Sequence, residues 1–399
     1  MMEGNRLMIG ITAGEWEGIH HRPHHMMKRA ARDGWTVLFI ESPMTFLSPI
    51  KDKSKLDHWK NSLKDIKEVE ERLHVITLPP FYPFGNKKRF INKMNQKRLL
   101  KAIKPFIDQG NFSAIDIYTF LPQTVDLLPL ISHEHLVYDC VDDHISFSGM
   151  MDKDMMLAME KELSEAAQVT YYTARQLKHL KESWANEAYL VPNGAEYEHF
   201  VVAEDLAKDE ANVPNDMKQY IKEGRTVIGI VGGIGDWVDL DIVYETAVKR
   251  EDYTFIVIGP VDTDVASHIL NQANIEFLGA RPYADLPNYL AFFDVCMIPF
   301  KINELTKSVN PIKMYEYLST GKQVVSTPIP EVVTYSDYVD IVHDADELVE
   351  KVESYRQLPD DVKQEKKQLR QQVGKENSWD ARWEIIKEKM LHAQSTRES

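Results

Sequence analysis

The sequence predicts an α/β fold made of two nucleotide-binding-type domains, each built on a mainly parallel sheet. Two observations support this prediction. The chain has 399 residues, which is more than one hydrophobic core usually serves, and short apolar segments alternate with helical segments through most of it. Because ligands of such folds bind beyond the carboxyl ends of the strands, we expect a site in a shared cleft between two facing domains.

The N-terminal half follows this alternation from its start. MIGITAG, residues 8–14, predicts a first strand, and a helix is predicted through residues 24–33. We expect further strands at 36–42, 74–80, 114–120, 136–141 and 169–174, and helices at 154–167 and 175–185. The sequence PNG at 192–194 is a strong turn former that closes the series. We therefore assign residues 1–200 to the first domain.

A second alternating series begins after a polar, acidic stretch at 201–224, which we interpret as the join between domains. Strands are predicted at 226–235, 253–260, 275–279, 295–300 and 323–329. The charged, helical region at 346–392 carries Trp379 and Trp383 four residues apart, which is an aromatic stripe that the last helix must bury. We assign residues 201–375 to the second domain and 376–399 to a helix that returns to the first.

Composition and charge exclude several classes of protein. Hydrophobic residues make up 43% and charged residues 27% of the chain, as in ordinary globular proteins. No apolar run approaches the roughly 18 residues of a membrane-spanning helix, and no signal-peptide pattern precedes the first strand. The formal net charge of -15 argues against general binding of nucleic acid. These features predict a cytoplasmic protein.

One segment opposes the acidic balance of the chain. Residues 81–104 carry eight cations and no acid among apolar residues that include Phe90, Met94 and Leu99. A basic amphipathic stretch of this kind is typical of an element that lies on an anionic membrane surface. That interpretation makes the protein peripheral on the inner face of the plasma membrane. The alternative is a core-facing helix whose basic side is solvated.

Several motifs resemble one known family. SVNPIKMYEYLSTGKQVVSTPIPEV, residues 308–332, resembles the donor-site segment of GT-B glycosyltransferases. Further similar segments are VPNGAEYEHF (191–200), VGGIGDW (231–237) and LGARPYADLPNYLAFFDVCMIPF (278–300). The N-terminal half is more loosely similar to transferases that build bacterial envelope polysaccharides, including those of teichuronic acid biosynthesis.

The resemblance implies a fold and a reaction. The fold is GT-B, with two Rossmann-like domains facing across a cleft and a C-terminal helix packing back toward the first domain. The reaction is transfer of a hexosyl or glycuronosyl group from a nucleotide-sugar, of the UDP type, held by the second domain. The acceptor is a lipid-linked sugar or an oligosaccharide held by the first domain. The nucleotide-sugar is a substrate, and no separate cofactor is implied.

The segment from Ser308 to Glu316 offers a receptor for a diphosphate. Pro311 suits the first turn of a helix, and Ser308 or Asn310 can cap it while backbone N–H groups point toward phosphate. By resemblance, Lys313 contacts the diphosphate and Glu316 binds the ribose. The alternative for these two residues is an ordinary surface pair at i,i+3. The family has a form in which two glutamates bracket seven residues, and Ser308 departs from it, which leaves retention or inversion of the sugar open.

Two further features belong to the predicted donor site. Gly232, Gly233 and Gly235 follow a buried strand and let a ligand approach the backbone closely, although a tight strand-to-helix turn is the alternative. Their spacing is not the GxGxxG fingerprint of dinucleotide sites, so NAD binding is disfavoured. Arg281 stands where the loop of the resembled family meets the nucleobase, or it is a surface residue.

Inverting transfer needs a base near the acceptor hydroxyl. Asp143, at the end of a predicted strand beside Asp142, is our first candidate, because adjacent carboxylates push one of the two pKa values upward, which suits a base near neutral pH. Glu15 after the first strand and His20 are the other candidates. The alternative for Asp142 and Asp143 is a loop that caps the next helix.

We predict no metal site. The histidines of HHRPHH at 20–25 form two i,i+4 pairs, but no carboxylate or thiol nearby completes a tetrahedral set. Cys140 and Cys296 lie in apolar strand-like runs, where a buried thiol behaves as a small hydrophobe.

Two rival functions fit the same sequence. A nucleotide-sugar epimerase of the same fold needs no separate acceptor. A non-catalytic nucleotide-binding subunit would retain affinity for the donor without turnover.

Overall fold

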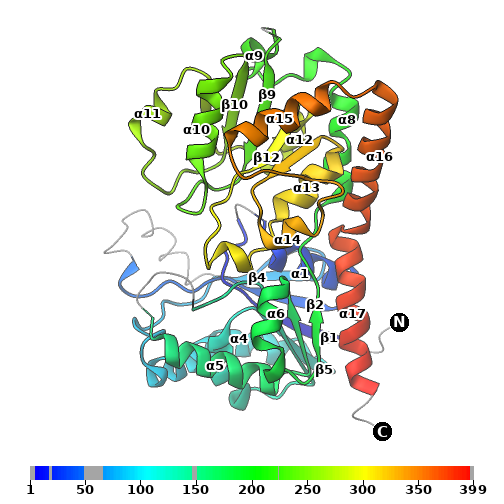
Figure 1. The fold of residues 1–399 in the computed structure, drawn as a ribbon. Helices are drawn as coiled ribbons and strands as arrows, with labels where there is room; N and C mark the ends of the chain where they lie inside the picture. The colour runs from blue at the N-terminus through cyan, green and yellow to red at the C-terminus, as the bar shows by residue number, and fades with distance from the viewer. Residues whose placement is uncertain (1–4, 18–19, 49–65, 146–150, 223, 396–399) are drawn as a thin grey trace. The chain divides into compact units, whose positions relative to one another are not determined.

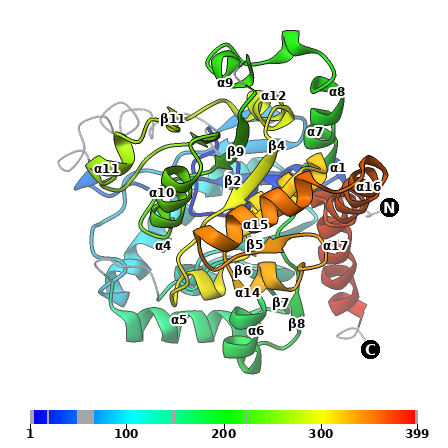
Figure 2. The same ribbon diagram turned by 45° about the horizontal axis from the view of Figure 1, so that its top comes forward.

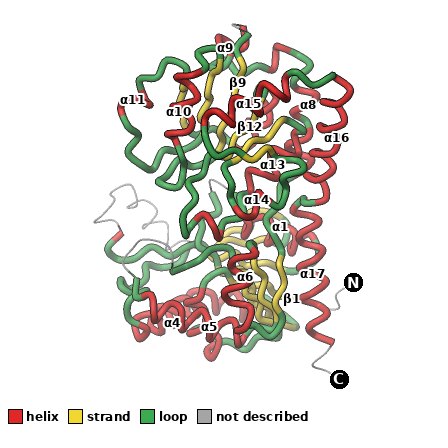
Figure 3. The backbone as a smooth tube through the Cα atoms, in the orientation of Figure 1, coloured by secondary structure: helices red, strands yellow, loops and turns green. Residues whose placement is uncertain are grey.

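The structure is a computed structural model that describes residues 5–17, 20–48, 66–145, 151–222 and 224–395. The chain divides into two compact units: unit 1 comprises Met1–Pro192 with Trp383–Ser399, and unit 2 comprises Asn193–Arg382. In each unit, helices cover the strands of a sheet (Figures 1 and 3). The α/β fold class predicted from the sequence is confirmed.

Unit 1 is built on an eight-stranded sheet, among the described residues, in the order β3-β4-β2-β1-β5-β6-β7-β8. Neighbouring strands are parallel except β3 and β4, which are antiparallel. The strands are β1 (Arg6–Ile11), β2 (Thr36–Ile40), β3 (Lys67–Glu70), β4 (Leu73–Ile76), β5 (Ala114–Thr119), β6 (His135–Cys140), β7 (Val169–Tyr172) and β8 (Ala188–Leu190). The polar edge strand β3 was not predicted, because its sequence KEVE lacks an apolar pattern.

The helices of unit 1 cover both faces of its sheet. They are α1 (Arg22–Arg32), α4 (Arg89–Gln109), α5 (Lys153–Ala166) and α6 (Arg175–Lys181), with 3-10 turns η1 (Pro122–Asp126), η2 (Leu128–Leu130) and η3 (Glu182–Trp184). In β1, Leu7 and Ile9 share a core with Leu99 of α4. On the opposite face, a Cβ added to Gly10 would lie 2.5 Å from the sulfur of Met27 in α1. The strand is therefore buried on both faces, as parallel sheets require.

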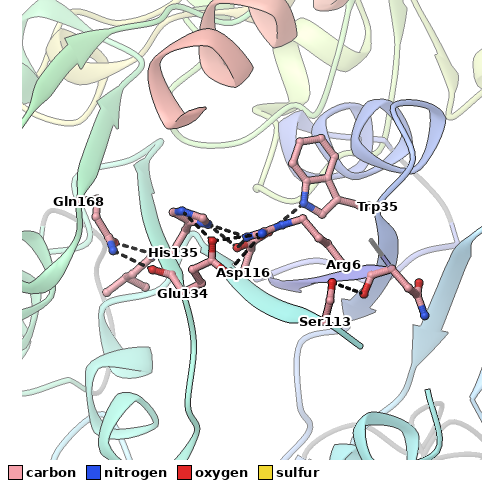
Figure 4. A network of polar contacts seen from close by, with 9 residues as sticks. Arg6, Trp35, Ser113, Asp116, Glu134, His135 and Gln168 are labelled. Carbon is pink, nitrogen blue, oxygen red and sulfur yellow. Dashed lines mark hydrogen bonds and ion pairs between the residues drawn. The ribbon is translucent and has the colours of Figure 1, made fainter. Parts of the chain in front are cut away.

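A network of polar side chains joins the amino ends of the strands in unit 1 (Figure 4). Arg6 donates to both carboxylate oxygens of Asp116, at 2.6 and 3.1 Å, and the indole of Trp35 donates to Asp116 at 2.8 Å. Nδ1 of His135 lies 2.5 Å from Asp116. Burial alone would raise the pKa of the Asp116 carboxyl, but the hydrogen bonds from His135, Arg6 and Trp35 outweigh it and lower the pKa.

The last helix, α17 (Trp379–Ser395), contributes its residues from Trp383 onward to unit 1. The indole of Trp383 packs edge-on against Trp35 and donates to Asp33 at 2.8 Å. Lys387 also bonds Asp33, at 2.8 Å, and the hydroxyl of Tyr171 donates to the carbonyl of Ile386 at 2.7 Å. The C-terminal helix thus packs on the N-terminal unit, as predicted.

Unit 2 is built on a six-stranded parallel sheet, among the described residues, in the order β11-β10-β9-β12-β13-β14. The strands are β9 (Thr226–Val231), β10 (Tyr253–Ile258), β11 (Ile275–Gly279), β12 (Val295–Ile298), β13 (Gln323–Ser326) and β14 (Asp340–Ile341). The helices are α7 (Tyr197–Val201), α8 (Ala203–Leu206), α9 (Lys218–Lys222), α10 (Leu240–Lys249), α11 (Ser267–Leu270), α12 (Leu286–Ala291), α13 (Ile312–Thr320), α14 (Pro330–Val333), α15 (Ala345–Arg356) and α16 (Asp360–Glu376). Short 3-10 turns are η4 (Glu210–Asn212), η5 (Tyr283–Asp285) and η6 (Thr306–Ser308).

Residues that alternate along the strands of unit 2 belong to two hydrophobic cores, one on each face of the sheet. Phe255 and Val257 of β10 join a core with Val243 of α10 and Leu348 of α15, two helices that lie side by side (Figure 2). Ile256, between them in sequence, belongs to the other core, with α12 and α13. The period of two in the apolar pattern therefore specifies which helices cover each face.

The acidic stretch at 201–224, which we interpreted as a join, contributes to unit 2. Val213, Met217 and Tyr220 are buried in the same core as α12 and α13. These apolar residues have charged neighbours in the sequence, so the polar composition of the stretch gave no indication that they are buried.

Candidate functional site

The start of α13 in unit 2 is the predicted donor site. The helix begins at Ile312 after Pro311, and no side chain caps its first turn. It ends at Gly321, whose φ of 75° suits glycine. The hydroxyl of Tyr317 accepts a hydrogen bond from the backbone N–H of Val231 at 2.8 Å, which fixes the helix against β9. An uncapped helix start with free N–H groups is a general anion receptor.

The expectation that Ser308 or Asn310 caps this helix is wrong. Asn310 is occupied elsewhere: its Oδ1 accepts from the backbone N–H of Asn193 at 2.9 Å, and its Nδ2 donates to the hydroxyl of Tyr315 at 3.1 Å. The side chain of Asn193 in turn donates to the Asn310 carbonyl at 2.8 Å. Ser308 is buried at the end of η6. Asn310 therefore fixes the loop before α13 and leaves the helix start open.

Lys313 and Glu316 form an ion pair at 2.6 Å on one face of α13. Glu316 is buried, whereas a quarter of the Lys313 side chain is exposed. Gly232 adjoins this pair, because a Cβ placed on it would lie 3.9 Å from Cε of Lys313. Its φ of 146° favours glycine. The structure thus brings three of the predicted donor residues together.

The other predicted donor residues are placed differently. A Cβ on Gly235 would meet the ring of Trp237 at 2.3 Å, which indicates a packing role, whereas Gly233 borders open space. Arg281 donates to Asp216 at 2.7 Å and to the hydroxyl of Tyr289 at 2.9 Å. These bonds hold Arg281 in a local ion pair, so a nucleobase would have to compete with Asp216 for the guanidinium.

In unit 1, the first candidate base is engaged with a buried cation. Asp143 accepts a bond from Nζ of Lys181 at 3.1 Å, and Lys181 also pairs with Glu160 at 2.8 Å. Burial alone would lower the pKa of Lys181, but the surrounding acidic groups raise it above its ordinary value. The Asp143 carboxylate is thus held in an ion pair with a buried lysine.

Asp142, beside it, has the opposite character. Burial, the largest cause, raises the pKa of the Asp142 carboxyl, and Asp143 raises it further. Burial lowers the pKa of the neighbouring His144. The expected raised pKa is therefore found on Asp142, with burial rather than its neighbour as the main cause.

Glu15 and His20 lie beyond the end of β1. Glu15 is exposed, and its carbonyl lies 2.9 Å from Nε2 of His24. The ring of His20 stacks on that of His24, with centroids 4.7 Å apart. Burial, followed by the charges of Lys28 and His25, lowers the pKa of His20 to about 4. His20 is therefore neutral near pH 7 and able to accept a proton, although weakly basic.

The histidine cluster is organised by hydrogen bonds and ring contacts. Nδ1 of His24 accepts from the backbone N–H of His21 at 3.1 Å, and Trp16 contacts the rings of both His20 and His24. Within the described residues, no group of three His, Cys, Asp or Glu side chains is placed to hold a metal ion.

Sequence reasoning missed a pocket of about 320 Å³ in unit 1. It lies where β1, β2, β4 and β5 end, between the residues that follow these strands and the first turns of α4. Thr12 and Glu41 come from the strand ends, and Asn92, Asn95 and Gln96 from α4. A signal existed in the sequence: these three amides share the helical spacing of Leu99 and Ile103, on the face that enters the core.

The basic segment 81–104 contains α4 from Arg89 onward. Leu99 and Ile103 are buried in the core of unit 1, which agrees with the alternative of a core-facing helix. The opposite side is exposed and carries Lys93, Lys97 and Lys101 beside Phe90 and Met94, which are 64% and 44% exposed. We call these five residues the basic face. In the part of the chain that the structure describes, no helix is long and apolar enough to cross a membrane.

Comparison with known proteins agrees with this geometry. Residues 225–357 match the family model described as Glycosyl transferases group 1. TuaH of Bacillus subtilis, a curated relative named as a teichuronic acid biosynthesis glycosyltransferase, is 28% identical over 229 residues. The match covers 53% of this chain and 55% of TuaH, so the chain spans about half the length of this relative.

Solved structures share the fold over nearly the whole chain. Sucrose-phosphate synthase from Thermosynechococcus elongatus has a TM-score of 0.72 at 14% identity, covering 99% of this chain and 100% of that one. HepE from Anabaena, solved with UDP and glucose, has a TM-score of 0.67 at 14% identity, covering 97% and 100%. The predicted GT-B fold is confirmed by these likenesses. The chain therefore has the GT-B fold, and its residues 225–357 are similar to the group 1 glycosyltransferases.

Proposed function

We propose that the chain transfers a sugar from a UDP-type donor, bound by unit 2, to a lipid-linked or oligosaccharide acceptor, bound by unit 1. The observation that carries this proposal is the uncapped start of α13 beside Lys313 and Glu316, inside the segment that matches the group 1 family. Helix N–H groups and one cation suit a diphosphate, and a buried carboxylate suits the ribose hydroxyls. The UDP bound in the HepE structure supports this nucleotide.

A role in cell-envelope polysaccharide synthesis, of the teichuronic acid type, follows as part of the proposal. It is supported by the name of the relative TuaH. Asp143 is the proposed base for the acceptor hydroxyl, with Glu15 and His20 as the other candidates.

The donor assignment is tested by calorimetric titration of the full chain with UDP, UDP-sugars, GDP and ADP. We expect UDP compounds to bind and the double variant Lys313→Ala, Glu316→Ala to lose about 10²- to 10⁴-fold in affinity, since two charged hydrogen bonds of about 1.5–3 kcal/mol each are removed. The matched control is Lys208→Ala, Asp205→Ala, because that pair in unit 2 has the same i,i+3 spacing and the same distance of 2.6 Å but is exposed. Equal affinity of parent and double variant would overturn the donor site.

Incubation with a donor alone separates transfer from its rivals. We expect no epimer of the sugar, and product only when an acceptor is added. Formation of the epimer without acceptor would identify an epimerase, and donor binding without product from any acceptor would favour a non-catalytic subunit.

We propose further that the basic face of α4 lies on an anionic membrane. Its lysines attract anionic lipid by about 1 kcal/mol each, while Phe90 and Met94 offer apolar contacts to the interface. Co-sedimentation tests this attraction, with vesicles of phosphatidylcholine alone and with vesicles that also contain about 30% phosphatidylglycerol. We expect binding only to the anionic vesicles and its loss in Lys93→Ala, Lys97→Ala, Lys101→Ala. Unchanged binding by the triple variant would refute the assignment.

A further inference from the structure

The pocket of unit 1 occupies the position at which parallel sheets bind ligands. Its lining comes from the residues just after β1, β2, β4 and β5, which are adjacent in the sheet, and α4 closes one side. Ligands of open α/β sheets bind beyond the carboxyl ends of their strands. This position favours a ligand site in unit 1 that is separate from the proposed nucleotide site at α13.

Two of the glutamines that line this pocket have an amide oxygen without a hydrogen-bond donor among the described residues. Oε1 of Gln96 and Oε1 of Gln123 are buried, and neither has a partner among the described residues. The nitrogens of the same amides are used: Gln96 donates to Asn92 at 3.2 Å and Gln123 to Asn86 at 3.0 Å. A buried acceptor without a donor costs free energy of folding. A ligand that donates hydrogen bonds to these oxygens would remove this cost.

The charge of the lining narrows the class of ligand. Glu41 is the one charged residue among the described lining residues, and no lysine, arginine or histidine is among them. Its oxygens accept from the backbone N–H of Trp16 at 2.7 Å and from the hydroxyl of Thr77 at 2.5 Å. A carboxylate or phosphate in the pocket would meet a negative charge and acceptor oxygens, and the described lining residues include no cation to balance it. Neutral hydroxyl groups suit this lining.

Size and shape also favour a sugar ring. A volume of about 320 Å³ lies at the lower end of the range of roughly 300–1,000 Å³ for small-molecule sites, so it suits one ring better than a chain of them. Tyr82 and Phe84 line the pocket and are 37% and 48% exposed, which leaves aromatic surface for the C–H face of a sugar. Asn95 holds their turn in place by bonding both the N–H and the carbonyl of Tyr82, at 2.8 and 3.0 Å.

We propose that this pocket binds a neutral hexose ring, the terminal sugar of the acceptor, and discriminates against a uronic acid ring or a phosphate. Hydroxyl groups of the ring donate to Gln96 and Gln123, and Glu41 supplies the charge that repels an anion. The identity of the ring as acceptor rests on the proposed transferase function. Its binding and its selectivity against anions do not.

Saturation-transfer NMR on the full chain tests the proposal. The probes are uncharged methyl hexopyranosides, the corresponding methyl uronosides and glucose 1-phosphate, each titrated in the presence of saturating UDP. We expect at least one neutral glycoside to bind at least tenfold more tightly than its uronoside. In Gln96→Met, which keeps the side-chain volume and removes the acceptor, we expect its affinity to fall at least tenfold.

Two further variants sharpen the result. Gln109→Met is the matched control, because Gln109 lies exposed at the end of the same helix, and its binding should equal that of the parent. Gln123→Lys adds a cation to the lining of the pocket and should admit the uronoside. The proposal is overturned if no neutral glycoside binds, if uronosides bind as tightly, or if Gln96→Met, shown to be folded by circular dichroism, binds like Gln109→Met.

This outcome is separable from that of the proposed function. If neutral glycosides bind in the pocket but no UDP compound binds unit 2, the transferase proposal fails and the sugar site stands. If UDP-sugars bind and turn over while the pocket takes no neutral ring, the sugar site fails and the transferase proposal stands.

Discussion

The two edges of the sheet in unit 1 use polar residues in opposite ways. At the amino edge, Asp116 is surrounded by Arg6, Trp35 and His135, and both of its oxygens are bonded (Figure 4). At the carboxyl edge, the oxygens of Gln96 and Gln123 lack donors among the described residues. A buried polar network whose groups are all hydrogen-bonded stabilises a fold. A buried polar group without a partner needs another explanation, and one such explanation is a bound ligand. The amino edge therefore stabilises the fold, and our proposals place ligand binding at the carboxyl edge.

The largest expected effect lies at the carboxyl edge. Asp143→Asn removes the proposed base, so we expect kcat to fall by 10²- to 10⁴-fold, the range typical of general base catalysis, with the affinity for UDP-sugar unchanged. Initial rates with saturating donor and acceptor measure this effect. Lys181 keeps its partner Glu160 in the variant, which limits the loss of stability.

Asp142→Asn is the control for the assignment of this base. If Asp142→Asn loses activity and Asp143→Asn does not, the carboxyl with the raised pKa is the base, and Asp143 only pairs with Lys181. Equal activity of both variants and the parent would exclude both carboxylates from proton transfer.

At the amino edge the corresponding change acts on stability. Asp116→Asn leaves Arg6 facing a neutral side chain in a buried network, so we expect a loss of about 3 kcal/mol in the free energy of unfolding. Urea titration followed by circular dichroism measures it, and kcat of the folded variant should match the parent. A large fall in kcat with little loss of stability would reverse the division between the two edges.

The same substitution has a distinct pH signature. Because the folded pKa of Asp116 lies below its unfolded value of about 3.9, its contribution is complete above that value and is lost as pH falls through the folded pKa. The gap in stability between parent and Asp116→Asn should therefore shrink below pH 4.

The separation of contacting residues in the sequence explains which parts of the molecule could be predicted. The donor residues Lys313 and Glu316 lie three residues apart on one helix, so their proximity follows from helical geometry alone. The bond of Arg281 to Asp216, 65 residues away, follows only from the packing of unit 2. Local sites can be predicted from spacing, and contacts distant in sequence cannot.

The pocket of unit 1 was missed for the same reason. It needs four strands in the order β4-β2-β1-β5, and the strands can be predicted from sequence far better than their order. What the sequence did contain was the set of amides on the buried face of α4. Polar residues at core spacing are costly unless they are bonded or bind a ligand, and this cost was the available clue.

A smaller effect concerns the histidines beyond β1. Burial, partly offset by a bond to the carbonyl of Glu15, lowers the pKa of His24 to about 4, whereas the unfolded value is about 6.5. Between these values the unfolded chain binds a proton that the folded chain does not, so stability falls as pH drops from 6.5 to 4. We expect a loss on the order of 2 kcal/mol from His24, with a flatter profile for His24→Gln. Parallel profiles for variant and parent would show that His24 is not the cause.

The smallest expected effect on stability concerns an exposed ion pair of α4. Lys104 and Asp108 form an exposed i,i+4 pair at 2.9 Å, which contributes about 0.3–0.5 kcal/mol. Asp108→Ala should therefore change the free energy of unfolding by less than about 0.5 kcal/mol. It also frees the charge of Lys104, one turn beyond Lys101, and so extends the positive stripe. If the basic face binds anionic lipid, Asp108→Ala binds such vesicles more tightly than the parent at low salt, and the gain disappears as salt screens the charges. A gain that persists at high salt would show that the contact is not electrostatic.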